Sequence, residues 1–249
     1  MNARHSLLWA LLLVLPAAAA VAADQTNRSG APQGDAEAGH KIVMEGTEAG
    51  AAPCSSCHQE NGAGNPEAKA PRIAGQPAFY LEKQLRDYAG GARRNEVMGP
   101  IAQALSDADK ANVAAYFAQA SAPLPKPAGN KNAEQAGHGR TLATVGVQEK
   151  GVEACANCHG PLGAGLPPSY PALAGQQADY IKAQLQAWQQ GTRKNDEADV
   201  MKYIAHRLDP QDIDAVAQFF ANARPDLTKG PAGAVPQVAD DPQNARRRP

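Results

Sequence analysis

Most of this 249-residue chain consists of two copies of one sequence, each close to 100 residues long. Residues 71–95 match residues 171–195 at an offset of 100, with 11 of 25 positions identical. Residues 98–120 match residues 201–223 at an offset of 103, with 10 of 23 positions identical. A duplication on this scale predicts two small domains of the same fold rather than one large domain.

The composition of the segments outside the two copies indicates where each domain begins and ends. The N-terminus has a short basic start, an apolar run and then small residues, which is the pattern of a cleaved secretory signal. Later in the chain no segment approaches the roughly 20 apolar residues that a membrane span needs. We therefore expect a periplasmic protein without a transmembrane span in its mature form. The predicted organisation is a signal peptide over residues 1–23, a first domain over 34–120, a Pro-rich linker over 121–135, a second domain over 136–224 and a disordered tail over 225–249.

The periodicity inside each copy is helical, and no convincing alternating strand appears. Ser106 with Asp109, and Asp209 with Asp212, are N-cap patterns ahead of the last helix of each copy. The fold class should therefore be all-α. The remaining expected helices cover residues 36–45 and 77–89 in the first copy and residues 136–145 and 177–189 in the second.

Each copy carries one Cys-x-x-Cys-His motif, and the two motifs lie 101 residues apart. This is the attachment pattern of c-type haem. Two thiols on one helical turn reach the two vinyl groups of a porphyrin, and the adjacent His becomes the proximal iron ligand. A dithiol redox pair would be expected near a βαβ pattern, and structural zinc would need both cysteine pairs in one small module. We therefore predict two covalently bound haem c groups, one held by Cys54, Cys57 and His58 and the other by Cys155, Cys158 and His159.

The sixth iron ligand decides what such a haem does. Met98 and Met201 occupy matching repeat positions, 40 and 42 residues after the two motif histidines. Met44 has no counterpart in the second copy. We therefore predict Met98 and Met201 as the distal ligands, and thioether ligation raises the haem potential relative to two nitrogens. The alternative distal ligands, which would give a lower potential, are His40, His138 and His206.

The sequence resembles the dihaem class I cytochromes c, specifically the cytochrome c4 family, over roughly residues 35 to 223. The likeness rests on the two haem motifs, on the Pro-x-(Ile/Leu)-Ala-Gly-Gln segments at 71–76 and 171–176, and on a Met ahead of a capped helix. It implies two tandem class I cytochrome c domains related by a pseudo-twofold axis. It also implies that the carbonyl groups of Pro71 and Pro171 accept a hydrogen bond from the proximal imidazoles. The candidates for contacts with the haem propionates are Gln76, Arg93, Gln176 and Arg193, with a solvated face as the alternative for these four.

Charge and ligation together narrow the function. With 24 basic and 25 acidic residues, the chain lacks the charge of a protein that binds nucleic acid by neutralising phosphates. The leading interpretation is an electron carrier, not an enzyme, that shuttles electrons between a quinol-oxidising complex and a terminal oxidase or other reductase. The second is an electron-accepting subunit of a periplasmic dehydrogenase that oxidises a sulfur compound or an alcohol. The third, a dihaem peroxidase or thiosulfate-oxidising cytochrome, needs one open iron, against which the two methionines count.

Overall fold

A computed structural model describes residues 34–129 and 132–225, which lie within one compact unit. The predicted signal peptide, and all of the predicted tail after Pro225, lie outside these residues. Within the two described stretches, no helix is long and apolar enough to cross a membrane.

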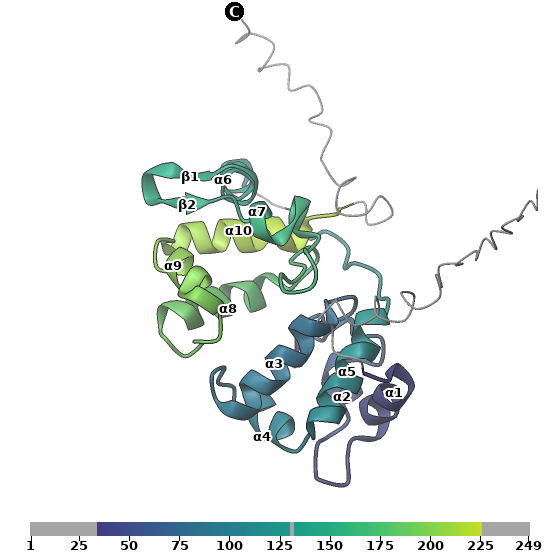
Figure 1. Ribbon diagram of the computed structural model, residues 1–249. Helices are drawn as coiled ribbons and strands as arrows, with labels where there is room; N and C mark the ends of the chain where they lie inside the picture. Colours follow the sequence, from purple (N-terminus) through teal and green to yellow (C-terminus); the bar gives the residue numbers. More distant parts are fainter. Residues whose placement is uncertain (1–33, 130–131, 226–249) are drawn as a thin grey trace, which may run out of the picture. The chain divides into compact units, whose positions relative to one another are not determined.

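The first half is a small helical domain around its own core. Helix α1 packs against α5, and α3 packs against both α4 and α5 (Figure 1). Val43, Val113 and Phe117 are buried at the centre of this packing. The elements are α1 (Ala36–Glu45), α2 (Ser55–His58), α3 (Ala78–Gly90), α4 (Met98–Gln103) and α5 (Asp107–Gln119).

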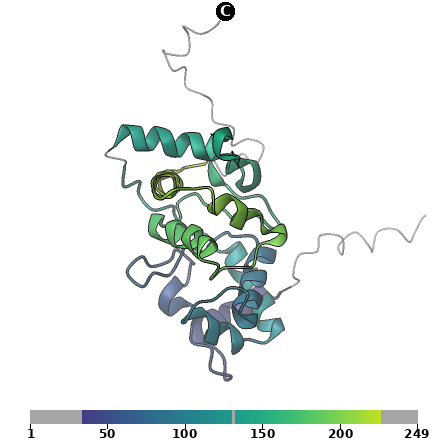
Figure 2. The same cartoon turned by 90° about the vertical axis from the view of Figure 1, so that its left-hand side faces the viewer.

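The second half repeats this plan with a separate core. Helix α10 lies between α6 and α8, which Figure 2 shows in a view nearly along α10. Leu142, Leu185 and Phe220 are buried between these helices. The elements are α6 (Ala133–Thr144), β1 (Gly146–Val147), η1 (Gln148–Lys150), β2 (Val152–Glu153), α7 (Ala156–His159), η2 (Pro161–Gly163), α8 (Ala178–Gln189), η3 (Glu197–Asp199), α9 (Val200–Ala205) and α10 (Pro210–Asn222).

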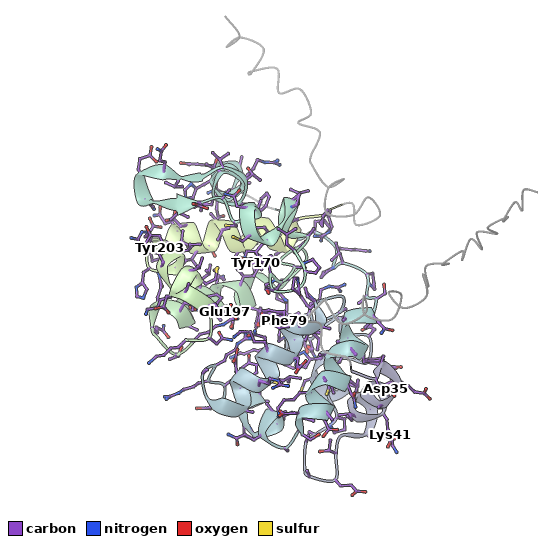
Figure 3. All side chains as sticks on the ribbon, in the orientation of Figure 1. Asp35, Lys41, Phe79, Tyr170, Glu197 and Tyr203 are labelled. Atoms are coloured by element: carbon purple, nitrogen blue, oxygen red, sulfur yellow. The ribbon has the colours of Figure 1, made fainter. Side chains whose placement is uncertain are left out.

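Side-chain caps fix where the long helices begin. Ser106 and Asp109 form a capping box at the start of α5, and Asp209 and Asp212 form another at the start of α10, as the sequence predicts. The side chain of Asp35, labelled in Figure 3, accepts hydrogen bonds from two main-chain N–H groups of α1. Helix α6 begins three residues earlier than expected, because Asn132 caps it.

Two glycines allow the first and last helices of each half to approach closely. A Cβ atom on Gly39 would lie 2.1 Å from the carbonyl oxygen of Asn112 in α5. A Cβ atom on Gly139 would lie 2.3 Å from the carbonyl oxygen of Ala215 in α10. Any larger residue at either position would force the two backbones apart.

The structure adds elements that the sequence patterns do not predict. The short strands β1 and β2 pair antiparallel, with Val147 opposite Val152. A two-residue strand is too short to show an alternating pattern, so the sequence does not reveal it. Helices α4 and α9 have six residues each, too few for a clear helical period. The architecture is otherwise helical in both halves, in agreement with the expected all-α class.

Candidate haem sites

The proximal histidines have matching environments in the two halves. His58 ends α2 and His159 ends α7, and both side chains are buried. Nδ1 of His58 lies 2.9 Å from the carbonyl oxygen of Pro71, and Nδ1 of His159 lies 2.9 Å from that of Pro171. A carbonyl only accepts, so Nδ1 carries the hydrogen and Nε2 keeps the lone pair that an iron ligand requires.

Electrostatics also favour the ligand form of these rings. Burial lowers the pKa of His58 and of His159, and the hydrogen bond to the proline carbonyl only partly opposes this effect. A lowered pKa keeps the imidazole neutral near neutral pH. Neutral imidazole is the form that binds a metal.

The four cysteines form two pairs, each on one helical turn, and no disulfide joins any of them. Burial raises the pKa of Cys54 to about 11 and that of Cys155 to about 11. Thiolate ligands of a structural zinc ion need the opposite shift. Within the described residues, no group of three or more His, Cys, Asp or Glu is placed to hold a metal. One imidazole and two thiols per half fit a covalently attached haem, in which the cysteines would bond the porphyrin and the imidazole would bind the iron.

Each candidate distal methionine lies at the start of a short helix. The N–H of Met98, the first residue of α4, donates to Oδ1 of Asn95 at 2.8 Å. The N–H of Met201 in α9 donates to Oδ2 of Asp196 at 2.7 Å. Met201 packs against the buried cluster of the second half, and Cys155 packs against the same cluster. Both methionines are half-buried.

The three alternative histidines have other surroundings. Nε2 of His40 lies 3.3 Å from Oε1 of Glu60, and Nε2 of His138 lies 2.6 Å from Oδ1 of Asp212. His206 is exposed at the end of α9. His40 and His138 each have an acidic partner at Nε2.

The guanidinium groups of Arg93 and Arg193 are buried together where the two halves meet. An isolated main-chain bridge pairs the two residues antiparallel. Arg93 donates to the hydroxyl of Tyr180 at 2.7 Å and to Oε1 of Gln184 at 2.6 Å. Both arginines donate to Oε1 of Gln84, at 2.9 and 3.2 Å. These partners are all neutral.

Two further observations concern the charge and the hydrogen bonds of this region. Among the described residues, neither arginine pairs with a carboxylate, and a buried charge without a counterion is costly. The ring of Trp188 lies 3.9 Å beneath the guanidinium of Arg193, and its Nε1 is buried without a hydrogen-bond partner. Carboxylates would satisfy both the cations and this donor, and a haem supplies two of them as propionates.

Gln76 and Gln176 lie in a different part of the same interface. Each carboxamide bonds to main chain of the opposite half, Gln76 to Ala172 and Gln176 to Arg72. The resemblance groups these glutamines with the arginines, whereas the structure places them beside the peptide groups that follow Pro71 and Pro171. One hydrogen of each amide nitrogen is not used by these bonds.

The neutral partners of the arginines are not recognisable from the sequence patterns. The two copies are identical at Gln84 and Gln184, and at Tyr80 and Tyr180. The helical period predicts only that these residues lie on α3 and α8, and not that they contact the arginines. Their identity across the duplication was the available signal. Asn195 also joins the cluster, because its side chain accepts from Arg193 at 2.9 Å and donates to Gln84 at 2.8 Å.

The second half also has an aromatic ring beside its proximal histidine. The ring of Tyr170, labelled in Figure 3, lies 6.2 Å from that of His159 in an edge-on arrangement and is 46% exposed. The matching residue of the first half is Ala70, which is buried. The surroundings of the two histidines therefore differ at this position.

The comparison with family models gives two matches, both to the cytochrome c family. They cover residues 36–121 and residues 132–224. Each match contains one Cys-x-x-Cys-His motif and the methionine that follows it.

Curated relatives with two different names each match more than two thirds of this chain. A protein named thiosulfate dehydrogenase electron acceptor, from Stutzerimonas stutzeri (strain A1501), is 44% identical over 191 residues, which cover 76% of this chain and 88% of the relative. Cytochrome c4 from Pseudomonas aeruginosa is 36% identical over 188 residues, which cover 75% of this chain and 87% of the relative.

Two solved structures extend this likeness to the fold. Thiosulfate dehydrogenase (TsdBA) from Marichromatium purpuratum matches with a TM-score of 0.70 and 35% identity, over 76% of this chain and 40% of that longer chain. Reduced cytochrome c4 from Pseudomonas stutzeri matches with a TM-score of 0.67 and 32% identity, over 77% of this chain and the whole of that chain.

Proposed function

Because this chain belongs to the cytochrome c family, as a dihaem member similar to cytochrome c4, we propose that it accepts electrons from a thiosulfate-oxidising enzyme and passes them to a respiratory acceptor. The family membership makes the protein an electron carrier with two covalently bound haem c groups, not an enzyme in its own right. Two one-electron centres allow a single molecule to hold two electrons.

A thiosulfate-oxidising enzyme as the electron donor is supported by the sequence identities of the relatives. The protein named as an acceptor of thiosulfate dehydrogenase is 44% identical to this chain, whereas the cytochrome c4 from P. aeruginosa is 36% identical. The second candidate donor is a quinol-oxidising complex, in the manner of a general respiratory shuttle. The match over the whole length of a cytochrome c4 structure favours this second candidate.

The proposed iron ligands are His58 with Met98 and His159 with Met201. The haem, when bound, supplies one-electron exchange at its iron. The chain keeps each imidazole neutral by burial, fixes its orientation through a proline carbonyl and leaves Nε2 free. Met98 and Met201 would supply thioether sulfurs as the second protein ligands, and an iron with both protein ligands in place favours electron transfer over small-molecule chemistry.

The proposed propionate contacts are Arg93 and Arg193, with Trp188 as an additional donor. Support comes from the absence of a carboxylate partner for either arginine within residues 34–129 and 132–225, and from the unpartnered Nε1 of Trp188. Gln76 and Gln176 remain candidates through their second amide hydrogen only.

The proposed location is the periplasm. The N-terminal signal pattern and haem attachment by cysteine pairs both point to export. Docking to redox partners is expected to be weak, because electron-transfer encounters bury little surface.

Rapid mixing tests the choice of donor. The oxidised holoprotein is mixed with catalytic amounts of a thiosulfate dehydrogenase and thiosulfate, or with a quinol-cytochrome c oxidoreductase and quinol. A single-haem cytochrome c serves as the control acceptor in both mixtures. We expect thiosulfate-dependent reduction of both haems, faster than that of the control. Fast reduction by the quinol system alone would contradict the thiosulfate-oxidising donor and support the respiratory shuttle.

A further inference from the structure

One peptide group in the second half links its proximal histidine to the first half. The carbonyl of Pro171 accepts from Nδ1 of His159 at 2.9 Å. The N–H of the same peptide group, which belongs to Ala172, donates to Oε1 of Gln76 at 2.9 Å. Two hydrogen bonds at opposite ends of one peptide group therefore connect the imidazole to a glutamine of the other half.

The first half contains the reciprocal arrangement. The carbonyl of Pro71 accepts from Nδ1 of His58 at 2.9 Å. The N–H of the same peptide group belongs to Arg72 and donates to Oε1 of Gln176 at 3.0 Å. Each half therefore supplies the glutamine that bonds to the peptide group behind the proximal histidine of the other half.

The orientation of each glutamine amide is determined by its two partners. Nε2 of Gln76 donates to the carbonyl of Ala172 at 2.9 Å, and Nε2 of Gln176 donates to the carbonyl of Arg72 at 2.8 Å. An exchange of oxygen and nitrogen would set an N–H group against a main-chain N–H group. Both side chains are only 6% exposed, so water does not compete strongly for these bonds.

Hydrogen bonds on the two ends of one amide strengthen each other. An acceptor on the N–H increases the negative charge on the carbonyl oxygen. This cooperativity strengthens each hydrogen bond by about 10–30%. A stronger acceptor draws the Nδ1 hydrogen further and makes the imidazole a more electron-rich ligand. An electron-rich ligand stabilises ferric over ferrous iron and so lowers the haem potential.

We propose that Gln76 and Gln176 are positioning residues that act crosswise, each polarising the peptide behind the proximal histidine of the other half and lowering the potential of that half's haem. The proposal rests on the proposed ligation by His58 and His159. It does not depend on which protein donates the electrons.

The two glutamines act with different strength. Oε1 of Gln176 is shared, because it also accepts from the N–H of Gln177 at 3.1 Å. The matching residue in the first half is Pro77, which has no N–H, so Oε1 of Gln76 has no such competitor. The effect of Gln76 on the second half therefore exceeds the effect of Gln176 on the first half.

The test replaces each glutamine with methionine, which keeps the length of the side chain and removes both hydrogen bonds. The midpoint potential of each haem is measured in the whole holoprotein by spectroelectrochemical titration. NMR signals of the ligand methionine methyl groups identify the two haems, after assignment with Met98→Ala and Met201→Ala. Loss of neither signal in those variants would disprove the ligation separately from the crosswise effect.

The expected shifts are upward and crosswise. Gln76→Met should raise the potential of the second-half haem, with up to about a twofold change in its ferrous-to-ferric ratio at fixed applied potential, since the bond to Gln76 strengthens the bond of His159 by only about 10–30%. Gln176→Met should raise that of the first-half haem by a smaller amount. The control is Gln177→Leu, which removes another bond across the interface, from Nε2 to the carbonyl of Ala70 at 2.8 Å, without touching either polarised peptide.

Three results would overturn the proposal: a shift confined to the haem of the mutated residue's own half, equal shifts of both haems, or the same shifts in Gln177→Leu. If Gln76→Met yields no holoprotein, Gln76→Asn and Gln76→Glu replace it. Asparagine is too short to reach the peptide and should raise the second potential. Glutamate retains an acceptor oxygen and should leave the potential at or below that of the unmodified protein, so equal potentials in these two variants would also refute the proposal.

Discussion

At the scale of single residues, the two halves rely on a few buried polar groups whose partners are themselves buried. The imidazoles donate to proline carbonyls, and the arginines donate to neutral amides and a phenol. Such groups are costly to bury unless every bond is made. Single substitutions at these positions should therefore change redox properties and stability together.

The methionine ligands give a prediction for one haem at a time. Met98→Ala should remove the weak sulfur-to-iron absorption band from the first haem and lower its potential, because thioether ligation raises potential. Met201→Ala should do the same to the second haem. Absorption spectroscopy and redox titration measure both effects. Met44→Ala is the control and should leave both haems unchanged; an unchanged band in either ligand variant would show that the sulfur comes from elsewhere.

The buried arginines give a second prediction. Arg93→Met removes a buried positive charge next to the proposed propionates, so the potential of at least one haem should fall. Loss of the proposed ion pair with a propionate should also lower the free energy of unfolding of the holoprotein by about 3 kcal/mol. Redox titration and denaturant unfolding test the two parts. Arg94→Met, at an exposed neighbouring position, is the control. An unchanged potential in Arg93→Met would place the propionates away from this arginine.

At the scale of elements, the helices are determined by their ends and by their closest approaches. Capping boxes fix the starts of α5 and α10, and glycines on α1 and α6 allow main chain to contact main chain. The sequence predicts the caps because they are local patterns. It does not predict the glycine contacts, because the partner of Gly39 is 73 residues away along the chain.

The close approach can be tested with paired glycine substitutions. Gly139→Ala places a methyl group 2.3 Å from the carbonyl oxygen of Ala215, so the free energy of unfolding should fall by about 1–3 kcal/mol. Gly137, on the same helix, has nothing within 4 Å of an added Cβ. Gly137→Ala should therefore raise stability by about 0.5–1 kcal/mol through helix propensity. Chemical denaturation of the holoprotein compares the two, and equal effects would argue against the close packing of α6 on α10.

The cap of α10 predicts a pH effect in the acid range. The hydrogen bond from Lys150 lowers the pKa of Asp209 to about 2, and the bond to the Asp212 main chain adds to this. A carboxyl whose folded pKa is lowered contributes stability above its unfolded pKa of about 4, and this contribution disappears as the pH falls toward 2. Asp209→Asn keeps a capping side chain without the charge. Its melting temperature should be lower than that of the unmodified protein at pH 6, and the gap should close between about pH 4 and 2; a constant gap would exclude the charge as its cause.

The sequence predicts the local parts of the haem sites and not the contacts between halves. The motifs locate the cysteines and histidines, and the capped helices follow from periodicity. The contacts of Gln76 with Ala172 and of Arg93 with Gln184 join residues more than 90 positions apart, and no periodic pattern encodes them. Pro100 in the first turn of α4 gives that segment the composition of a turn, which hides the helix that begins at Met98.

At the scale of the whole molecule, each half has a core of its own. The buried cluster around Phe117 and the one around Phe220 share no residue. Hydrogen bonds among polar side chains and main chain join the two halves. The halves should therefore fold around their cofactors with considerable independence.

Loss of one proximal ligand tests this independence. His58→Ala should prevent stable maturation of the first haem while the second still attaches, because Cys155, Cys158 and His159 lie in the other half. Intact-mass spectrometry of the exported protein counts the attached haems. His206→Ala is the control and should retain two. Loss of both haems from His58→Ala would mean that the halves depend on each other during maturation.

The reciprocal glutamine contacts have a consequence for how such a molecule is assembled. Residue 76 of one copy meets residue 172, and residue 176 meets residue 72, which is the isologous pattern of a symmetric homodimer. Joining two such subunits in one polypeptide makes their association intramolecular and independent of protein concentration. Fusion also lets the two sides of a formerly identical surface diverge, as Pro77 and Gln177 have done.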